Sequence, residues 1–180
     1  ESLSVRGVVS VSDTKDTTTG GIVGINHGTL ISCQFTGVVT GDSEVGGIVG
    51  RNESEGTIDH STARAIVTGK SSTGGIAGYN LGANTEYRKP SPDTDGSPPK
   101  MVDYINNKGA AADDDATNSV TNVATDTGGV AGRSSGMILT SVNTGTIGYE
   151  HIGYNGGGTV GRTGGLVSGC VNLRHVLGRR

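Results

Sequence analysis

The chain has 180 residues, of which 33 are glycine, one is phenylalanine and none is tryptophan, and only 17% are charged. So much glycine, without a collagen period and without low-complexity tracts, indicates many tight turns between short strands. The net charge of −3 gives no basic surface for nucleic acid, and no apolar run is long enough to span a bilayer. We therefore expect neither a nucleic-acid partner nor insertion into a membrane.

A five-residue glycine motif recurs along the chain and defines a repeat. Gly-Gly-Ile-Val-Gly or a variant occupies residues 20–24, 46–50, 74–78, 128–132 and 157–161, at spacings of 26, 28, 54 and 29 residues. The spacing of 54 corresponds to about two units. A unit of about 26 residues, with two or three short strands, cannot bury its own apolar face and must stack on its neighbours. We expect residues 1–180 to form a single domain of about five repeats.

Aligning the units places residues of one kind at equivalent positions, so that three columns are apolar and one is small. The columns are Val9, Val39, Val67 and Ile147; Ile22, Ile48, Ile76 and Val130; Leu30, Ile58, Ile138 and Val167; and Cys33, Ser61, Ser141 and Cys170. Stacked coils would turn each column into a buried ladder and pair each strand with the strand above it. The pattern predicts an all-β parallel β-solenoid (β-helix). The alternative, a two-sheet sandwich, would not explain why one position stays apolar or small through successive units.

The two cysteines, Cys33 and Cys170, are too far apart in this arrangement to be bonded. One coil per repeat separates them by about four coils, roughly 19 Å at ~4.8 Å per coil. A disulfide needs Cα atoms within ~7 Å. We therefore expect two free, buried thiols that act as small apolar side chains.

The repeat is interrupted over residues 83–122, within its third unit. All four prolines lie between Tyr87 and Lys100, and proline cannot donate to a strand ladder, so this stretch is expected to be a loop. Residues 101–109 resemble a later coil and predict a return to the solenoid, and residues 110–122 predict a second loop. Insertions within one repeat project from one face and often bind a partner; a tolerated surface loop is the alternative.

This interruption and its surroundings carry the candidate binding residues. Three tyrosines could form an aromatic platform for a partner, the alternative being ordinary strand and loop tyrosines. An aspartate run could hold calcium together with loop carbonyls, but it lacks the alternating ligands of known calcium loops, and the alternative is an exposed acidic loop. The candidate partner-binding residues are Tyr79, Tyr87, Tyr104, Asp113, Asp114 and Asp115. Apart from calcium, we expect no cofactor.

Several motifs of catalytic or nucleotide-binding sites arise only from the repeat. Residues 132–136 fit the hydrolase nucleophile pattern and residues 156–161 fit a dinucleotide fingerprint, but their glycines belong to the repeat and no helical pattern accompanies them. Residues 69–71 end like a phosphate-binding loop without its leading glycine. The four histidines show no metal-ligand spacing, which favours solvated turn positions. We predict no catalytic residue, no cofactor-binding residue and, the aspartate run aside, no metal ligand.

An asparagine recurs two residues after the third glycine of the motif, at Asn26, Asn52 and Asn80. We expect these residues to take left-handed turn positions or to stack as an amide ladder along the solenoid. Glycan binding is a further alternative.

The unit at residues 20–41 reads Gly-Gly-Ile-Val-Gly-x-Asn-x-Gly-Thr-Leu-x-x-Cys-x-x-x-Gly-x-Val-x-Gly and resembles the GLUG repeat of bacterial surface proteins. The resemblance covers most of residues 20–172 and weakens in the fifth unit, at Thr159 and Leu173. Such repeats occur in adhesin-like proteins and in non-catalytic regions of streptococcal immunoglobulin A metalloproteases. The resemblance implies a secreted, cell-wall-attached protein and carries over no catalytic residue, because the zinc motif of those proteases is absent.

Three functions follow from these inferences. The first is a non-catalytic module of a bacterial cell-surface or secreted protein that serves in adhesion or as a rigid spacer, with a host protein, a glycan or neighbouring domains of its own chain as partner. The second is an accessory domain that positions substrate for a host-directed immunoglobulin A metalloprotease. The third is a polysaccharide-active β-helix enzyme, which would need carboxylates clustered on successive coils, and the aligned columns show no stacked acidic pair.

Localisation rests on the resemblance alone. The sequence begins at Glu1 and shows no signal peptide or anchor, so we expect a fragment of a longer protein. The resemblance implies an extracellular protein held at the cell surface or cell wall.

Overall fold

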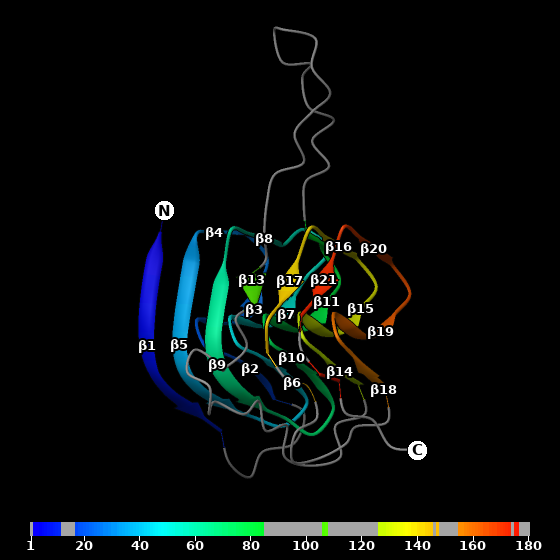
Figure 1. The fold of residues 1–180 in the computed structure, drawn as a ribbon. Helices are drawn as coiled ribbons and strands as arrows, with labels where there is room; N and C mark the ends of the chain where they lie inside the picture. Colours follow the sequence, from blue (N-terminus) through cyan, green and yellow to red (C-terminus); the bar gives the residue numbers. More distant parts are fainter. Residues whose placement is uncertain are drawn as a thin grey trace, which may run out of the picture.

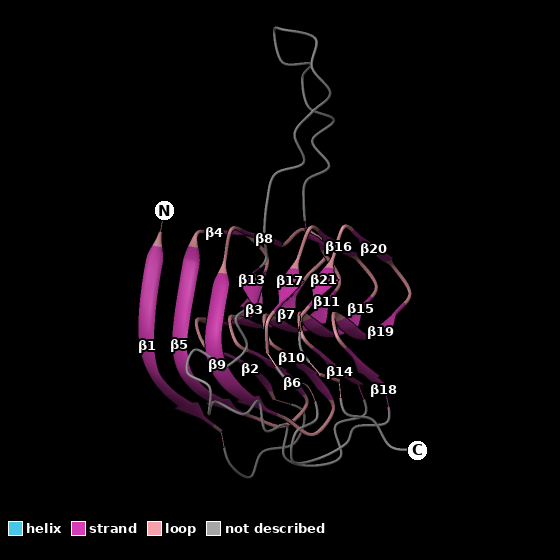
Figure 2. Ribbon diagram, viewed as in Figure 1, coloured by secondary structure: helices cyan, strands magenta, loops and turns pink. Residues whose placement is uncertain are grey.

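The computed structural model describes residues 2–11, 17–84, 106–107, 126–145, 147, 155–173 and 175–176. In these ranges every element of regular secondary structure is a β-strand (Figure 2). The described part of the chain contains no helix that is long and apolar enough to cross a membrane. The protein is all-β, as its glycine-rich composition predicts.

The strands form rows, with equivalent strands of successive coils side by side. Sheet A contains β1 (Leu3–Ser10), β5 (Cys33–Thr40), β9 (Thr62–Thr68), β13 (Asn106–Asn107), β17 (Val142–Asn143) and β21 (Val171–Asn172). Sheet B contains β2 (Thr18–Gly20), β6 (Glu44–Gly46), β10 (Ser72–Gly74), β14 (Asp126–Gly128) and β18 (Asn155–Gly157). Sheet C contains β3 (Val23–Asn26), β7 (Val49–Asn52), β11 (Ala77–Asn80), β15 (Ala131–Ser134) and β19 (Val160–Thr163). The remaining strand of each coil lies in sheet D, formed by β4 (Thr29–Ile31) and β8 (Thr57–Asp59), or in sheet E, formed by β12 (Ala83–Asn84), β16 (Met137–Leu139) and β20 (Leu166–Ser168).

The rows arise because the chain winds as a parallel β-solenoid. A strand pairs in parallel with the strand four places further along the chain, as β2 does with β6 and β6 with β10. The chain therefore makes four turns between β2 and β18. Figure 1 shows the rows running from β1 at one end of the stack to β18, β19 and β20 at the other. The predicted fold class is confirmed, but the solenoid makes about four turns where about five repeats were expected, and each coil has four short strands rather than two or three.

The columns expected from the alignment lie in register. Leu30 pairs with Ile58, and Ile138 pairs with Val167. In the intervening coil Asn84 takes this position and pairs with Ile138. The other apolar columns are Val9, Val39 and Val67, paired in sheet A, and Ile22, Ile48, Ile76 and Val130, joined by backbone hydrogen bonds from coil to coil. Every described strand pair is parallel, so the sandwich alternative is wrong.

The core is filled differently in the early and the late coils. The second glycine of the motif lies against Phe35 and Ala63 in the first two coils, and both side chains are fully buried. The equivalent contacts in the last two coils are made by Asn143 and Asn172, whose amides are joined by a hydrogen bond of 2.8 Å from Nδ2 of Asn143 to Oδ1 of Asn172. The side chain that packs against the second motif glycine thus changes from apolar to amide along the stack, while apolar residues such as Val130 and Ile138 remain buried in the late coils.

The three glycines of the motif allow sheets B and C to approach each other closely. A Cβ atom at Gly46 would lie 2.6 Å from the carbonyl oxygen of Ile76, and one at Gly50 would lie 2.6 Å from the backbone nitrogen of Thr19. At Gly47, a Cβ atom would lie 2.7 Å from the Cβ of Ala63 and would also clash with the backbone of the next coil. Real Cβ contacts do not occur at such distances, so this corner excludes every residue with a side chain.

The recurring asparagines form an amide ladder. Asn26 Nδ2 donates to Asn52 Oδ1 at 2.7 Å, and Asn52 Nδ2 donates to Asn80 Oδ1 at 2.9 Å. Asn80 Nδ2 then donates to Ser134 Oγ at 3.3 Å. All four side chains are buried. The ladder prediction is confirmed. The hydrogen bonds between successive coils give these buried polar side chains the partners that they need.

The alternative of left-handed turn positions for the three asparagines is wrong, because their backbones are extended in strands. Positive φ occurs instead at the residue before the small column, with values of 53° at Ser32, 47° at His60, 45° at Thr140 and 64° at Gly169. The sharp bend of each coil therefore lies just before sheet A.

The cysteines are both free, as predicted. Cys33 is buried, with 4% of its surface exposed, and its backbone N–H donates to Ser61 Oγ in the same column. Cys170 is only half-buried, because it lies in the last described coil, where no further layer covers it. The expectation of a buried thiol is therefore wrong for Cys170.

The interruption at residues 83–122 is described only at two points. β12 continues the third coil at Ala83–Asn84, and β13 lies between β9 and β17 in sheet A. The chain has therefore rejoined the solenoid at Asn106–Asn107, inside the segment expected to return. The two predicted loops lie outside the described residues.

Replacing Gly47 by alanine tests the close approach at the glycine corner. The added methyl group has no space, and overpacking of this kind costs about 1–3 kcal/mol. The Gly47→Ala variant should therefore unfold at a clearly lower urea concentration, measured by circular dichroism. Gly28 is the matched control, because a Cβ atom there meets nothing within 4 Å. Equal midpoints for Gly47→Ala and Gly28→Ala would contradict the steric explanation.

Replacing Asn52 by alanine tests the amide ladder. The change leaves Asn26 Nδ2 and Asn80 Oδ1 without their ladder partners, and an unsatisfied buried polar group costs about 1–3 kcal/mol. We expect the same urea experiment to show a loss of that size for Asn52→Ala. The Asn172→Ala control also removes an acceptor, that of Asn143 Nδ2, but it does so in the exposed last coil, where water can take its place, and it should cost less. A smaller loss for Asn52 than for Asn172 would contradict the proposed contribution of the ladder.

Candidate functional site

A column of large side chains runs along sheet C, at the residue that follows the third glycine of the motif. Ile25 pairs with Arg51, Arg51 with Tyr79, Tyr79 with Arg133, and Arg133 with Arg162. Strands of neighbouring coils are ~4.8 Å apart, so these side chains follow one another at a short, regular spacing. We call Arg51, Tyr79, Arg133 and Arg162 the arginine column.

Tyr79 lies between two guanidinium groups. The Cζ atom of Arg51 is 5.0 Å from the centre of the Tyr79 ring, and that of Arg133 is 5.1 Å away. Arg51 belongs to the preceding coil and Arg133 to the following one, so each covers a different face of the ring. The Tyr79 hydroxyl is 3.2 Å from Ser135 Oγ. Tyr79 therefore holds two cations by cation–π contact and does not offer an open ring face.

Arg51 is neutralised by two carboxylates. Its Nη1 donates to Glu44 Oε1 at 2.7 Å, and its Nε donates to Glu53 Oε1 at 2.8 Å. Glu44 comes from the neighbouring strand β6, and Glu53 directly follows β7. The positive charge of this end of the arginine column is therefore balanced within the protein.

Glu44 is the less favourably placed of the two carboxylates. Burial raises its pKa above the ordinary value of 4.5, and this effect outweighs the attraction of Arg51. Its second oxygen, Oε2, is buried without a hydrogen-bond partner among the described residues. The Glu44 carboxylate is thus held in place by Arg51 at a cost in desolvation.

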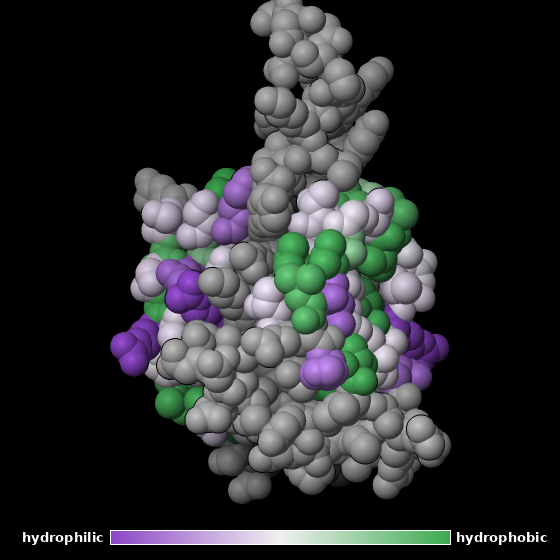
Figure 3. All heavy atoms as spheres, viewed as in Figure 1, coloured by the Kyte–Doolittle hydropathy of each residue, from purple (hydrophilic) through white to green (hydrophobic). Residues whose placement is uncertain are grey.

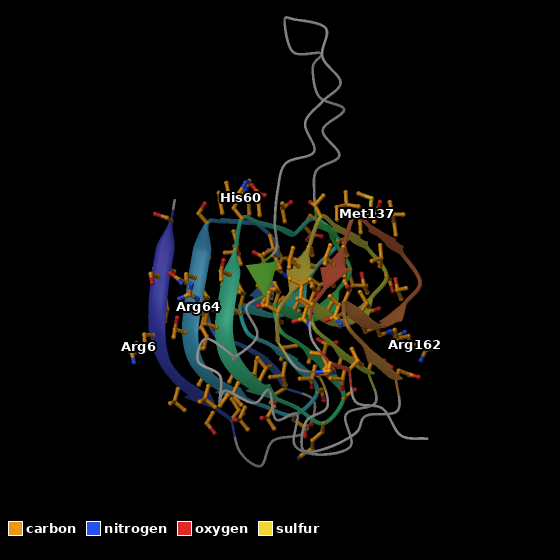
Figure 4. The ribbon with its side chains drawn as sticks, in the orientation of Figure 1. Arg6, His60, Arg64, Met137 and Arg162 are labelled. Atoms are coloured by element: carbon orange, nitrogen blue, oxygen red, sulfur yellow. The ribbon has the colours of Figure 1, made fainter. Side chains whose placement is uncertain are left out.

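Arg133 and Arg162 are cations without a described counter-ion. No ion pair to either residue occurs in the ranges that the structure describes, and the two are paired directly across neighbouring strands. Arg162 is exposed, and Figure 4 shows it extending from the end of the stack. Asp126 in β14 takes the register position that Glu44 holds in β6, and it is buried and accepts a hydrogen bond of 2.6 Å from Asn155 Nδ2. The site therefore presents two adjacent positive charges.

Of the candidate binding residues expected from the sequence, Tyr79 alone lies in the described part of the chain. Tyr87, Tyr104, Asp113, Asp114 and Asp115 fall outside it. The aromatic platform and the calcium site remain predictions. In the described ranges, no three His, Cys, Asp or Glu side chains are close enough together to hold a metal ion.

The described histidines are exposed. His27 Nδ1 is 2.8 Å from Glu55 Oε1, and this hydrogen bond is the main reason why the pKa of Glu55 is lowered to about 2. His60 Nδ1 lies 2.8 Å from Asp59 Oδ1. These contacts are surface pairs between neighbouring side chains and do not form a site.

The sequence contains a signal for the arginine column, but the signal is hard to see because the residue type at this repeat position varies. The position after the third glycine reads Ile, Arg, Tyr, Arg and Arg in the five units. It varies in chemistry, so it does not stand out in an alignment, but three arginines at one repeat position predict stacked cations once the coil is known.

The burial of Glu44 predicts a pH dependence of stability. Its raised pKa means that the folded chain binds more protons than the unfolded chain above pH 4.5, so this residue lowers stability as the pH rises through that window. Glu44→Gln removes the charge, and its stability relative to the wild type should improve between pH 4 and pH 7 in urea unfolding.

Glu55 provides a control of opposite sign. Its lowered pKa contributes stability above pH 4.5 that is lost as the pH falls toward 2. The stability of Glu55→Gln relative to the wild type should therefore fall as the pH rises from 2 to 7.

Parallel pH profiles of stability for the wild type and Glu44→Gln would show that burial does not disfavour the Glu44 charge.

Comparison with known proteins identifies one segment of the chain. No curated protein and no solved structure matches the chain. The family model of the GLUG motif matches residues 41–68. This segment contains β6, β7, β8 and β9, which together form one complete coil, and it includes Glu44 and Arg51 of the site. The chain therefore carries a GLUG-motif repeat, and the four-stranded coil is the form which that repeat takes here.

Proposed function

We propose that the chain is a non-catalytic repeat module of a bacterial cell-surface or secreted protein, acting as a binding or rigid spacer domain. The GLUG match and the β-solenoid fit a repeat module of a bacterial protein. The observation that supports the role most directly is the unbroken coil-to-coil register of the first motif glycine, from Gly20 to Gly157. A stack in which every layer is fixed by the next resists bending and can hold attached parts at a set separation.

The terminal coils support neighbouring domains of the same chain as partners. All large apolar side chains that are exposed in the described ranges belong to the first or the last layers of the stack. They are Leu3, Val8, Val11, Ile25, Ile31, Leu166, Val167, Val171, Leu173 and Val176. Figure 3 shows apolar side chains gathered where β17, β20 and β21 lie. Uncovered apolar ladders with open strand edges favour contact with a further β layer.

Localisation at the bacterial surface is tested by antibody labelling of intact cells of the source bacterium. An antibody against the purified chain should label unpermeabilised cells or detect the protein in the medium. Labelling that appears only after permeabilisation would contradict the proposal.

The non-catalytic role is tested by incubating the purified chain with polysaccharides. No shorter fragments should be released, and depolymerisation would contradict the non-catalytic role.

Replacing residues 85–105 by Leu-Thr-Ser separates a binding role from a spacer role. Asn84 and Asn106 pair with Ile138 and Val142, between which lie Leu139, Thr140 and Ser141, so a three-residue link suits the geometry from β12 to β13. We expect the variant to keep the circular-dichroism spectrum of the wild type and to lose binding to host glycoproteins in a plate assay. Unchanged binding would reduce this part of the chain to a spacer, and loss of the β spectrum would show that residues 85–105 are part of the fold.

A further inference from the structure

Two like charges stand directly opposite each other at the end of the arginine column. Arg133 in β15 is the register partner of Arg162 in β19. Like charges at directly opposed positions of neighbouring strands destabilise a sheet. A natural sequence keeps such a local conflict mainly where function requires it.

In the described part of the protein no carboxylate lies at ion-pair distance from Arg133 or Arg162, and Glu44 attracts Arg133 only from further away. Arg51, at the other end of the column, is compensated by Glu44 and Glu53 at hydrogen-bond distance. Arg133 stacks on Tyr79. A stacked ring does not accept hydrogen bonds from the N–H groups, which lie in the plane of the guanidinium, so these donors stay available for a ligand. Arg162 is exposed. The pair therefore offers two adjacent guanidinium groups, of which one is already held in position.

We propose that Arg133 and Arg162 bind acidic groups of a polysaccharide that lies along the outer face of sheet C. Guanidinium groups bind carboxylates and sulfates through paired, charge-assisted hydrogen bonds. Stacking on Tyr79 reduces the conformational entropy that Arg133 loses on binding. The proposal rests on the binding role proposed above and adds to it a second surface, separate from residues 85–105, whose ligand class is an acidic polysaccharide.

The surroundings favour an acidic polysaccharide over a more densely charged polymer. Glu44 and Glu53 lie beside Arg51 in the same column, and the whole chain has a net charge of −3, so a nucleic acid would meet repulsion along most of its length. Ser135 is exposed, and its hydroxyl lies 3.2 Å from that of Tyr79, so hydroxyl groups that suit the neutral hydroxyls of sugars lie beside Arg133. A polysaccharide with acidic groups spaced between neutral sugars matches this combination of guanidinium and hydroxyl groups.

The test measures binding of the intact chain to polygalacturonate and to heparin by biolayer interferometry. These probes distinguish carboxylate from sulfate recognition, and dextran, poly-glutamate and a single-stranded oligonucleotide serve as comparisons. We expect binding to one or both acidic polysaccharides, weakened about three- to tenfold by Arg133→Gln or Arg162→Gln and more than tenfold by both.

Arg6→Gln is the matched control, because Arg6 is an exposed arginine in β1 at the opposite end of the stack (Figure 4). It should leave binding unchanged. In the absence of ligand, Arg162→Gln should be as stable as the wild type or more stable, since it removes a like-charge contact. A purely structural role for Arg162 would instead give loss of stability.

The proposal is overturned by absence of binding to both acidic polysaccharides, by equal weakening with Arg6→Gln, or by equal binding of poly-glutamate or the oligonucleotide. If the chain is found at the bacterial surface but binds neither polysaccharide, this inference fails while the proposed function stands. If binding is found but the protein is confined to the cell interior, the proposed function fails.

Discussion

The close approach of sheets B and C is the constraint on which the rest of the molecule depends. At this corner the chain reverses direction over the motif glycines, and the backbone of the next coil lies where side chains would otherwise be. The requirement recurs in each coil, and it fixes the register of the strands on either side. The apolar columns, the amide ladder and the arginine column all take their alignment from it.

The interior shows how a small, aromatic-poor chain fills its core. Side chains such as Phe35 and Ala63 occupy the space over the motif in the early coils, and amides occupy it in the late coils. An amide column can replace an apolar one because each amide donates to the next and accepts from the last, as Asn26, Asn52 and Asn80 do. A buried polar group is tolerated when stacking supplies its partner automatically. The repeat thus satisfies its polar interior by the same register that buries its apolar side chains.

The sequence was sufficient to predict the solenoid, because periodic glycine and periodic apolar residues follow directly from stacking. It was sufficient for the amide ladder only as one of several alternatives, since an asparagine after a glycine also suits a left-handed turn. The bends at Ser32, His60 and Thr140 were missed, because these residue types share no preference for positive φ. The contact of Tyr79 with two arginines could not be predicted from residue identity, because it exists only between side chains of three different units.

The connection between the strands of sheets E and A has a consequence for how such a protein changes in length. Three residues, 139–141, separate Ile138 from Val142, whereas residues 85–105 intervene between their register partners Asn84 and Asn106. Strand β13 nevertheless keeps its place between β9 and β17. The register of each strand is set by the coils above and below, but the length of this connection is not. New material can therefore enter at this bend or as a whole coil, and the bend is a natural point for grafting foreign peptides onto the rod.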